Sequence, residues 1–148
     1  MKINIEINEN KRNQDGLANI SITVPDLELK SIVVLPFEEI YNRCGIPDEN
    51  SLDFLLIASL CYAIDKAIPR STAFDFWTRT LEVEFPVSDL DKWNNACEDL
   101  TKALNFLTGD IWLISFCKME NLIFQAPPPK KRRKIKPKLE KVEAVCSF

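Results

Sequence analysis

The chain has 148 residues, of which 46% are hydrophobic and 28% charged, with a formal net charge of −3, so it can bury one core of ordinary size. Histidine is absent, which excludes Ser-His-Asp and Cys-His nucleophiles, H-E-x-x-H zinc sites and the commonest general base at neutral pH. The three glycines, Gly16, Gly45 and Gly109, are too scattered for a glycine-rich phosphate-binding loop.

The N-terminal quarter predicts three strands. Isoleucines alternate with polar residues over 3–7, and apolar residues alternate again over 20–24. This period of two is typical of half-buried strands, and the polar turn at 9–17 would join them into a hairpin. The apolar run 32–35 predicts a third strand, and Pro36 marks its end or a sheet edge.

A long helix is predicted over about 51–68. Asn50 or Ser51 can cap its start, and Pro69 stops it. Apolar residues lie on nearly every side of this helix, so it is either central in the fold or covered by a partner. If a partner covers it, the residues that we expect to bind that partner are Leu56, Leu60 and Ile64.

A fourth strand and a second long helix follow. Residues 79–85 alternate between apolar and polar, and Pro86 closes the strand. Ser88 and Asp91 then stand at the S-x-x-D spacing of a capping box. Apolar residues recur at helical three- and four-residue steps until Gly109, which can take the left-handed position that ends a helix.

The last predicted strands of the folded part are 110–116 and 122–124, joined by a short turn at 119–121. Trp93 and Trp112 are expected to pack in the core or against the sheet. Strands and helices are mixed without regular alternation. We therefore expect an α+β fold, with a mostly antiparallel sheet of about five to six strands packed with two main helices on one sheet face.

Charge is split unevenly along the chain. Residues 130–148 hold eight Lys or Arg and two Glu, a net of +6, whereas residues 1–129 hold 11 basic and 20 acidic residues, a net of −9. Residues 126–141 begin with a proline run that stiffens the backbone and removes amide donors, which predicts an extended linker. We therefore expect a domain at 1–125, this basic linker, and a separate apolar strand at 142–148.

The linker carries a basic cluster, PPPKKRRKIK, with three possible roles. It resembles a nuclear-localisation signal, it could contact nucleic-acid phosphates or other anions through charge, or it simply carries the chain over an acidic surface. The third role is favoured, because a basic cluster alone is a weak signal for the other two. No aromatic side chain is interleaved with residues 130–138, so base stacking has no platform there. The residues that would contact an anion or nucleic acid are Lys130, Lys131, Arg132, Arg133 and Lys134.

Cysteine usage and apolar runs indicate the compartment. The five cysteines are an odd number without a C-x-x-C pair, which favours free thiols in a reducing environment over disulfides or structural zinc. The N-terminus has no apolar signal core, and the longest apolar region, around 52–64, is too short to cross a bilayer. We expect a cytoplasmic protein with no metal and no membrane partner.

One stretch resembles a known family. Residues 81–116, LEVEFPVSDLDKWNNACEDLTKALNFLTGDIWLISF, resemble the amino-terminal region of proteins related to 7-cyano-7-deazaguanine synthase in Qat-type anti-phage operons. The matching pieces are Phe85-Pro86, Trp93, Leu107-Thr108-Gly109-Asp110 and Trp112. The rest of the chain is similar only loosely. The resemblance implies an accessory domain that precedes a catalytic domain.

The resemblance also implies a role for residues 142–148. In that family a basic, proline-containing linker leads to a short apolar strand and then to a serine-glycine-glycine-x-aspartate-serine loop that grips ATP phosphates. The matching lead-in here is Val145, Cys146, Ser147 and Phe148, and the given sequence stops before the loop. The resemblance therefore implies no catalytic or cofactor-binding residue in this chain, and ATP is expected only for the absent downstream domain.

The function that we expect is recognition. A non-catalytic accessory domain would dock its own missing C-terminal domain or another protein of the defence operon, and the chain would be a fragment, a split gene product or a truncated reading frame. Two alternatives stay open. One is a stand-alone protein-interaction module, and the other, less favoured, is a nucleic-acid-associated protein that uses residues 130–138.

Overall fold

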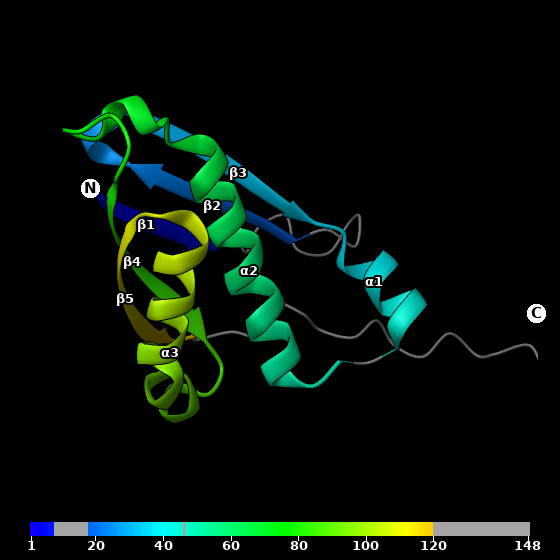
Figure 1. Ribbon diagram of the computed structural model, residues 1–148. Helices are drawn as coiled ribbons and strands as arrows, with labels where there is room; N and C mark the ends of the chain where they lie inside the picture. Colours follow the sequence, from blue (N-terminus) through cyan, green and yellow to red (C-terminus); the bar gives the residue numbers. More distant parts are fainter. Residues whose placement is uncertain (8–17, 46, 120–148) are drawn as a thin grey trace, which may run out of the picture.

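The computed structural model describes residues 1–7, 18–45 and 47–119 (Figure 1). Three strands come first, then two helices, then a strand-helix-strand unit. In chain order the elements are β1 (Lys2–Ile7), β2 (Ala18–Val24), β3 (Leu29–Leu35), α1 (Phe37–Cys44), α2 (Glu49–Ala67), β4 (Thr80–Val87), α3 (Leu90–Thr108) and β5 (Ile111–Lys118). Short 3-10 helices, η2 (Pro25–Leu27) and η3 (Arg70–Thr72), follow β2 and α2.

The five strands form one sheet in the order β3-β2-β1-β4-β5. The pairings β1–β2 and β2–β3 are antiparallel, which confirms the N-terminal hairpin and the third strand. The pairings β1–β4 and β4–β5 are parallel, because α2 and α3 carry the chain back before β4 and β5 begin. The predicted α+β class is confirmed, with two long helices and a sheet whose two halves are paired differently.

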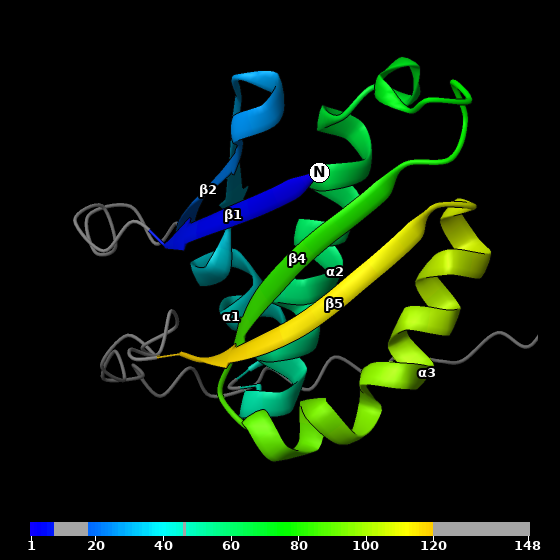
Figure 2. The same cartoon turned by 90° about the vertical axis from the view of Figure 1, so that its left-hand side faces the viewer.

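Both long helices lie on the same face of the sheet (Figures 1 and 2). Side-chain alternation explains this arrangement, since in β4 the apolar residues Leu81, Val83 and Phe85 are buried and the intervening glutamates are exposed. Ile20 and Ile22 of β2 are buried on the same side. The hydrophobic core therefore fills the single layer between the sheet and the helices.

Helix α2 is central in the fold. Its residues Leu56, Leu60 and Ile64 are 1%, 0% and 0% exposed and belong to the hydrophobic core. The prediction that these three residues bind a partner is wrong, because another protein cannot reach side chains that the sheet already covers. The alternative interpretation of the apolar pattern, a central helix, is the one that the structure confirms.

The helix starts differ from the predictions. Asp48 caps α2, and its carboxylate accepts a hydrogen bond of 3.0 Å from the Ser51 amide. Asp89 caps α3 by accepting from the Lys92 amide at 3.2 Å. Ser88, the predicted cap of α3, instead contacts Asp53 of α2. Helix α1 was not predicted.

Strand β4 continues through Pro86 to Val87, so the prediction that this proline closes the strand is wrong. The Glu82 amide donates to β1 at Met1 O, whereas Val87 O accepts from the Met119 amide on the β5 side. Backbone groups alternate in direction along a strand, so Pro86 faces the β1 side. The β1–β4 register stops at Val83, and the missing amide of Pro86 therefore interrupts no ladder.

Several predictions fall outside the described residues. These are the strand at 122–124, the linker at 126–141, the strand at 142–148, the basic residues Lys130, Lys131, Arg132, Arg133 and Lys134, and the family lead-in Val145, Cys146, Ser147 and Phe148.

Candidate functional site

Five large apolar side chains are exposed where α2 and α3 end and β4 begins. Phe74, Phe76 and Trp77 belong to the loop between η3 and β4, and Phe106 and Leu107 belong to the last turn of α3. Phe74 is 104% exposed and Phe106 is 88% exposed. We call these five residues the aromatic surface. Large apolar side chains that are exposed on neighbouring elements are candidates for an interaction site.

The loop is held by a tight turn around Asp75. Its carboxylate accepts hydrogen bonds from the amides of Trp77 at 2.9 Å and Thr78 at 2.7 Å. The Phe76 amide donates to Ala73 O at 3.0 Å, and Ala73 itself is buried. The two amides that bind the Asp75 carboxylate hold its pKa below the ordinary value. The turn therefore fixes the backbone that carries the three aromatic residues.

Phe76 has a φ of 58°, in the left-handed region. This conformation is a genuine outlier for a bulky residue, and such strain persists only where surrounding contacts enforce it. The side chain is 71% exposed, so no core packing among the described residues explains the strain. The observation is consistent with a loop shaped to present its side chains outward.

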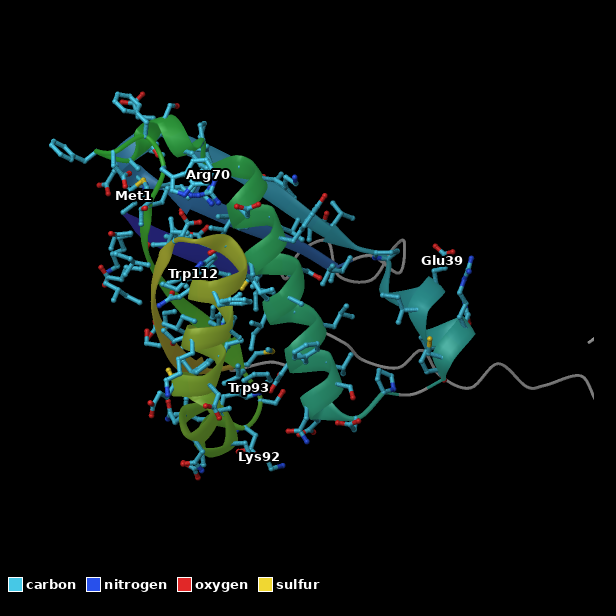
Figure 3. All side chains as sticks on the ribbon, in the orientation of Figure 1. Met1, Glu39, Arg70, Lys92, Trp93 and Trp112 are labelled. Atoms are coloured by element: carbon cyan, nitrogen blue, oxygen red, sulfur yellow. The ribbon has the colours of Figure 1, made fainter. Side chains whose placement is uncertain are left out.

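Arg70, which is labelled in Figure 3, contacts both the loop and the end of α3. Its guanidinium donates to Trp77 O and to Thr108 O, each at 2.7 Å, and its Cζ lies 5.1 Å from the centre of the Trp77 ring. This is the geometry of a cation–π contact. The Arg70 side chain thus connects the loop to the end of α3.

Beneath the aromatic surface lies a buried ionic cluster. Arg79 is 1% exposed, and its guanidinium donates to Asp110 at 3.1 and 2.5 Å, to Asp65 Oδ1 at 2.6 Å, and to the carbonyls of Asp65 at 3.1 Å and Ile68 at 2.6 Å. Arg70 adds a contact of 3.3 Å to Asp110. The five guanidinium hydrogens of Arg79 are matched by five acceptor contacts. The cluster is therefore a structural support.

Charge pairing sets the protonation of this cluster. Burial by itself raises the pKa of the Asp110 carboxyl, but the hydrogen bonds and charge of Arg79, with the charge of Arg70, outweigh burial and hold that pKa below its ordinary value. Burial likewise opposes the charge of Arg79, and its contacts with Asp110 and Asp65 raise the guanidinium pKa in spite of it. Both groups are therefore ionised at neutral pH.

A second buried carboxylate lies near the other end of α2. Asp53, 1% exposed, accepts hydrogen bonds from the Ser88 amide at 2.9 and 3.1 Å, the Ser88 hydroxyl at 2.8 Å and Trp93 Nε1 at 2.9 Å. The Trp93 ring packs 5.7 Å from that of Phe116. This cluster ties α2 to the turn between β4 and α3.

Other chemical features are few in the described ranges. Within 1–7, 18–45 and 47–119, there is no group of three or more Cys, Asp or Glu residues placed to hold a metal ion. Burial raises the pKa of the Cys61 thiol to about 12, and burial together with the charge of Glu84 raises the pKa of Cys117. None of the helices in this part of the chain is both long and apolar enough to cross a membrane.

The aromatic surface was missed at the level of sequence, although a signal existed. Residues 73–77 read Ala-Phe-Asp-Phe-Trp, with three aromatic residues in four positions between the helix stop at Pro69 and the strand predicted from Arg79. Such a segment follows neither a helical nor a strand period. A short connection lies at the surface and has too few neighbours to bury several large rings. Three aromatic residues in such a connection therefore predict that some of the rings are exposed to solvent.

None of the protein families, curated proteins and solved structures compared with this chain matches it. The assignment of the candidate site therefore depends on its own geometry.

Proposed function

We propose that this protein is a non-catalytic recognition domain that binds another protein through the aromatic surface. The observation that carries the proposal is the exposure of five large apolar side chains on one turn-stabilised loop and one adjoining helix end. The resemblance of residues 81–116 supports the same role. It implies an accessory domain of a deazaguanine synthase-like defence protein, with the downstream catalytic domain or an operon protein as the partner.

The composition of the aromatic surface suits protein binding. Burying one Phe side chain contributes about 1.5–3 kcal/mol, and Trp is among the residues that most often dominate binding energy at interfaces. Asp75 and Arg70 already fix the backbone of the loop, so binding would not have to order that backbone. The cost of ordering the loop is therefore removed from the free energy of binding.

The charges near the aromatic surface favour a protein over an anionic membrane as the partner. Asp75 lies inside the loop, and Asp65 lies at the end of α2 with its side chain 36% exposed. The nearest cation, Arg70, is engaged with two carbonyls and a carboxylate. Membrane-binding surfaces instead surround their apolar residues with lysine and arginine.

The proposal is tested by recovering partners of the full chain from its source cells. The double variant Phe74→Ser with Phe106→Ser removes two exposed rings of the aromatic surface. The matched control is Phe54→Ser, which removes a ring that is 62% exposed on α2. We expect a partner that co-purifies with the wild type and the control and is lost with the double variant. A partner retained by the double variant would contradict the role of this surface.

We further propose that the ATP-dependent chemistry implied by the resemblance is performed by a downstream domain. The residues that match the family here are those of the accessory region and the lead-in to the phosphate loop. Calorimetric titration of the 148-residue chain with Mg-ATP should show no binding. Saturable binding of ATP would contradict this assignment and would leave the proposed role of the aromatic surface untouched.

A further inference from the structure

Strand β3 forms an open edge of the sheet. One side of β3 pairs with β2, and no described strand pairs with its other side. Every second residue of such an edge directs its amide and carbonyl outward, and natural edges are usually protected by proline, charge or a bulge. Residues 31–35 read Ser-Ile-Val-Val-Leu, with neither proline nor charge. Within the described part of the chain, this edge can therefore pair with a further strand.

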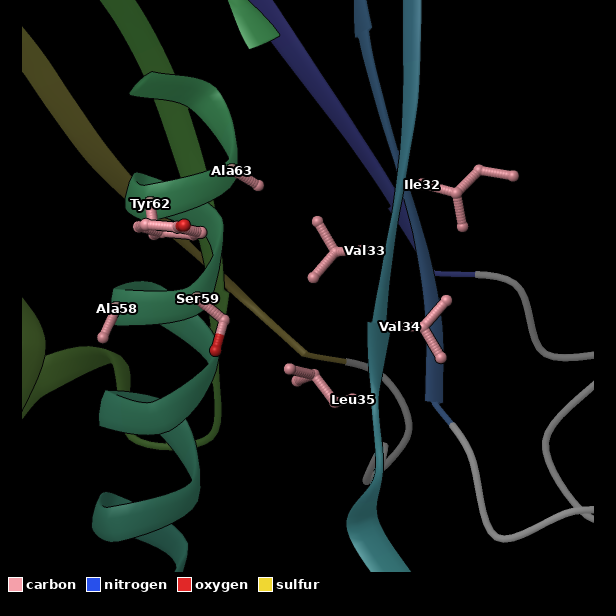
Figure 4. A pocket seen from close by; sticks show the side chains of 8 residues that line it. All are labelled: Ile32, Val33, Val34, Leu35, Ala58, Ser59, Tyr62 and Ala63. Carbon is pink, nitrogen blue, oxygen red and sulfur yellow. The ribbon is translucent and has the colours of Figure 1, made fainter. Parts of the chain in front are cut away.

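An apolar groove lies beside this edge, between β3 and helix α2 (Figure 4). Val33 and Leu35 point from β3 toward α2. The groove has a volume of about 520 Å³, and α2 contributes Ala58, Ser59, Tyr62 and Ala63 to its lining. No lining residue carries a charge. The open edge is thus uncharged on the helix side as well as along its backbone.

Two large residues of β3 are exposed on the other face of the sheet. Ile32 is 59% exposed and Val34 is 48% exposed, and both point away from α2 in Figure 4. Cross-strand neighbours on the same face stabilise β-branched residues in a sheet. Within the described residues, β2 supplies such neighbours on one side of β3 only. A further strand beside β3 would give Ile32 and Val34 neighbours on both sides.

We propose that the open edge of β3 pairs with the same edge of a second copy of this chain, so that two five-stranded sheets join into one. The two strands would run antiparallel about a two-fold axis at Ile32, the middle residue of β3. In this register Ile32 lies opposite Ile32 of the second copy. Lys30, the single charged residue of β3, lies opposite Val34. No like charges within β3 therefore face each other.

Charge explains why a second copy fits this edge. Residues 1–129 carry a net charge of −9, so two copies repel each other over most orientations. In a two-fold contact each surface meets itself, and an uncharged surface can do so without like-charge repulsion. Residues 31–35 and the groove lining form such a surface. A partner attracted by the acidic charge of the chain would gain nothing here, whereas a second copy requires an edge of this kind.

The size of the contact suits a reversible dimer. The seven residues of β3 are about 23 Å long at about 3.3 Å per residue. The sheet and helix layers together are about 20 Å deep, so the edge would bury roughly 460 Å² per copy and roughly 900 Å² in total. Stable interfaces bury about 1,200–2,000 Å², and weaker, transient ones bury less. We therefore expect a dimer that dissociates at micromolar concentrations.

This inference goes beyond the proposed function, because β3 and α2 carry it and the aromatic surface belongs to other elements. The two proposals can therefore fail separately. The double variant Phe74→Ser with Phe106→Ser should lose the partner of the aromatic surface and still dimerise as the wild type does.

Sedimentation equilibrium of the full 148-residue chain tests the proposal. Between roughly 1 µM and 1 mM, we expect the average mass to rise from 17.0 kDa toward twice that value. Ile32→Glu places two carboxylates opposite each other at the two-fold axis and should weaken dimerisation at least about tenfold. The matched control is Leu113→Glu, the same change at a residue that is 52% exposed on β5, at the opposite edge of the sheet. This control should dimerise as the wild type does.

Three results would overturn the proposal. The first is a wild type that stays at 17.0 kDa up to roughly 1 mM. The second is equal weakening by Ile32→Glu and Leu113→Glu, because association would then depend on net charge alone. The third is loss of the dimer in the Phe74→Ser, Phe106→Ser variant, because the aromatic surface would then be the contact between copies.

Disulfide trapping supplies a measurement that does not introduce a charge into β3. Ile32→Cys places one thiol of each copy at the two-fold axis, where opposite Cα atoms of antiparallel strands are about 4.5–5.5 Å apart, within the range of a disulfide. Leu113→Cys is the matched control. Both variants carry Cys44→Ser and Cys146→Ser, so that the exposed native thiol and the one outside the described residues do not compete.

With oxidised glutathione, we expect Ile32→Cys to form covalent dimers at least about tenfold faster than Leu113→Cys at the same protein concentration, because pairing of the β3 edges raises the effective concentration of the two thiols. Equal rates for the two variants would contradict pairing of the β3 edges.

Discussion

Two buried polar clusters connect α2 to the rest of the fold, one near each end of the helix, and they differ in charge. At the N-terminal end, Asp53 is surrounded by neutral donors from Ser88 and Trp93. At the C-terminal end, Asp110 and Asp65 pair with Arg79, and Arg70 extends the network to the surface. Only the charged cluster supports a loop that exposes aromatic rings.

The difference suggests why two arginines are used. The neutral cluster joins two elements only: Asp53 connects α2 to Ser88 in the turn between β4 and α3. A guanidinium has five donors in a fixed plane, so Arg70 can bind two backbone carbonyls and face an indole ring at once. The charged cluster at the C-terminal end of α2 thus fixes an exposed loop, whereas the neutral cluster at the N-terminal end of α2 connects elements around the core.

The largest effect is expected from Asp110→Ala. The substitution leaves the buried guanidinium of Arg79 without its main carboxylate, and breaking a buried pair in this way costs about 3–5 kcal/mol of unfolding free energy. Denaturant unfolding of wild type and variant measures the loss. A loss below about 1 kcal/mol would mean that the two ends of α2 do not differ as described.

A smaller loss is expected from Asp53→Ala at the neutral end. The Ser88 and Trp93 donors lose their acceptor, and each unsatisfied buried group costs about 1–3 kcal/mol, reduced here because those residues are only partly buried. The same unfolding experiment should rank this variant between the wild type and Asp110→Ala. The reverse ranking would contradict the comparison.

Acid titration sharpens the contrast further. The folded pKa of Asp110 lies below its unfolded value of about 3.9, so its contribution to stability is complete above that pH and is lost as pH falls through the folded pKa. Below about pH 4 the unfolding free energy of the wild type should decline more steeply than that of Asp110→Asn, by at most about 1.4 kcal/mol per pH unit. Parallel profiles would show that Asp110 is not the titrating group.

The smallest effect on stability is expected at the aromatic surface itself. Phe74 is fully exposed, so Phe74→Ser should change the unfolding free energy by less than about 0.5 kcal/mol. The core residue Leu60, changed to Ala as a reference, should cost about 2–5 kcal/mol. A large loss from Phe74→Ser would mean that the ring packs against the protein and is unavailable to a partner.

Local patterns predicted most of the strands and both long helices, because a period of two or of three to four residues depends on near neighbours. Gly109 was correctly expected to end α3, where it adopts a φ of 70°. Pairing between β1 and β4 was not predicted, because the partner of a strand depends on contacts some 80 residues away in the chain. The cap at Asp48 was missed because Asn50 and Ser51 are equally good capping residues.

The candidate site was harder to predict than the fold. Leu56, Leu60 and Ile64 were considered as a binding surface because a helix that is apolar on every side has two explanations, and only the position of the sheet decides between them. Arg79 and Asp110 are 31 residues apart, so no local pattern reveals their contact. The aromatic run at 74–77 was visible in the sequence, but its exposure became evident only with the fold.

The most direct test of the central claim is hydrogen exchange of the full chain, alone and bound to the partner that co-purifies with it. If the aromatic surface binds the partner, exchange should slow in residues 73–78 and in the last turn of α3 around Phe106. Slowing that is confined to other segments, with these two unchanged, would show that recognition takes place elsewhere on the molecule.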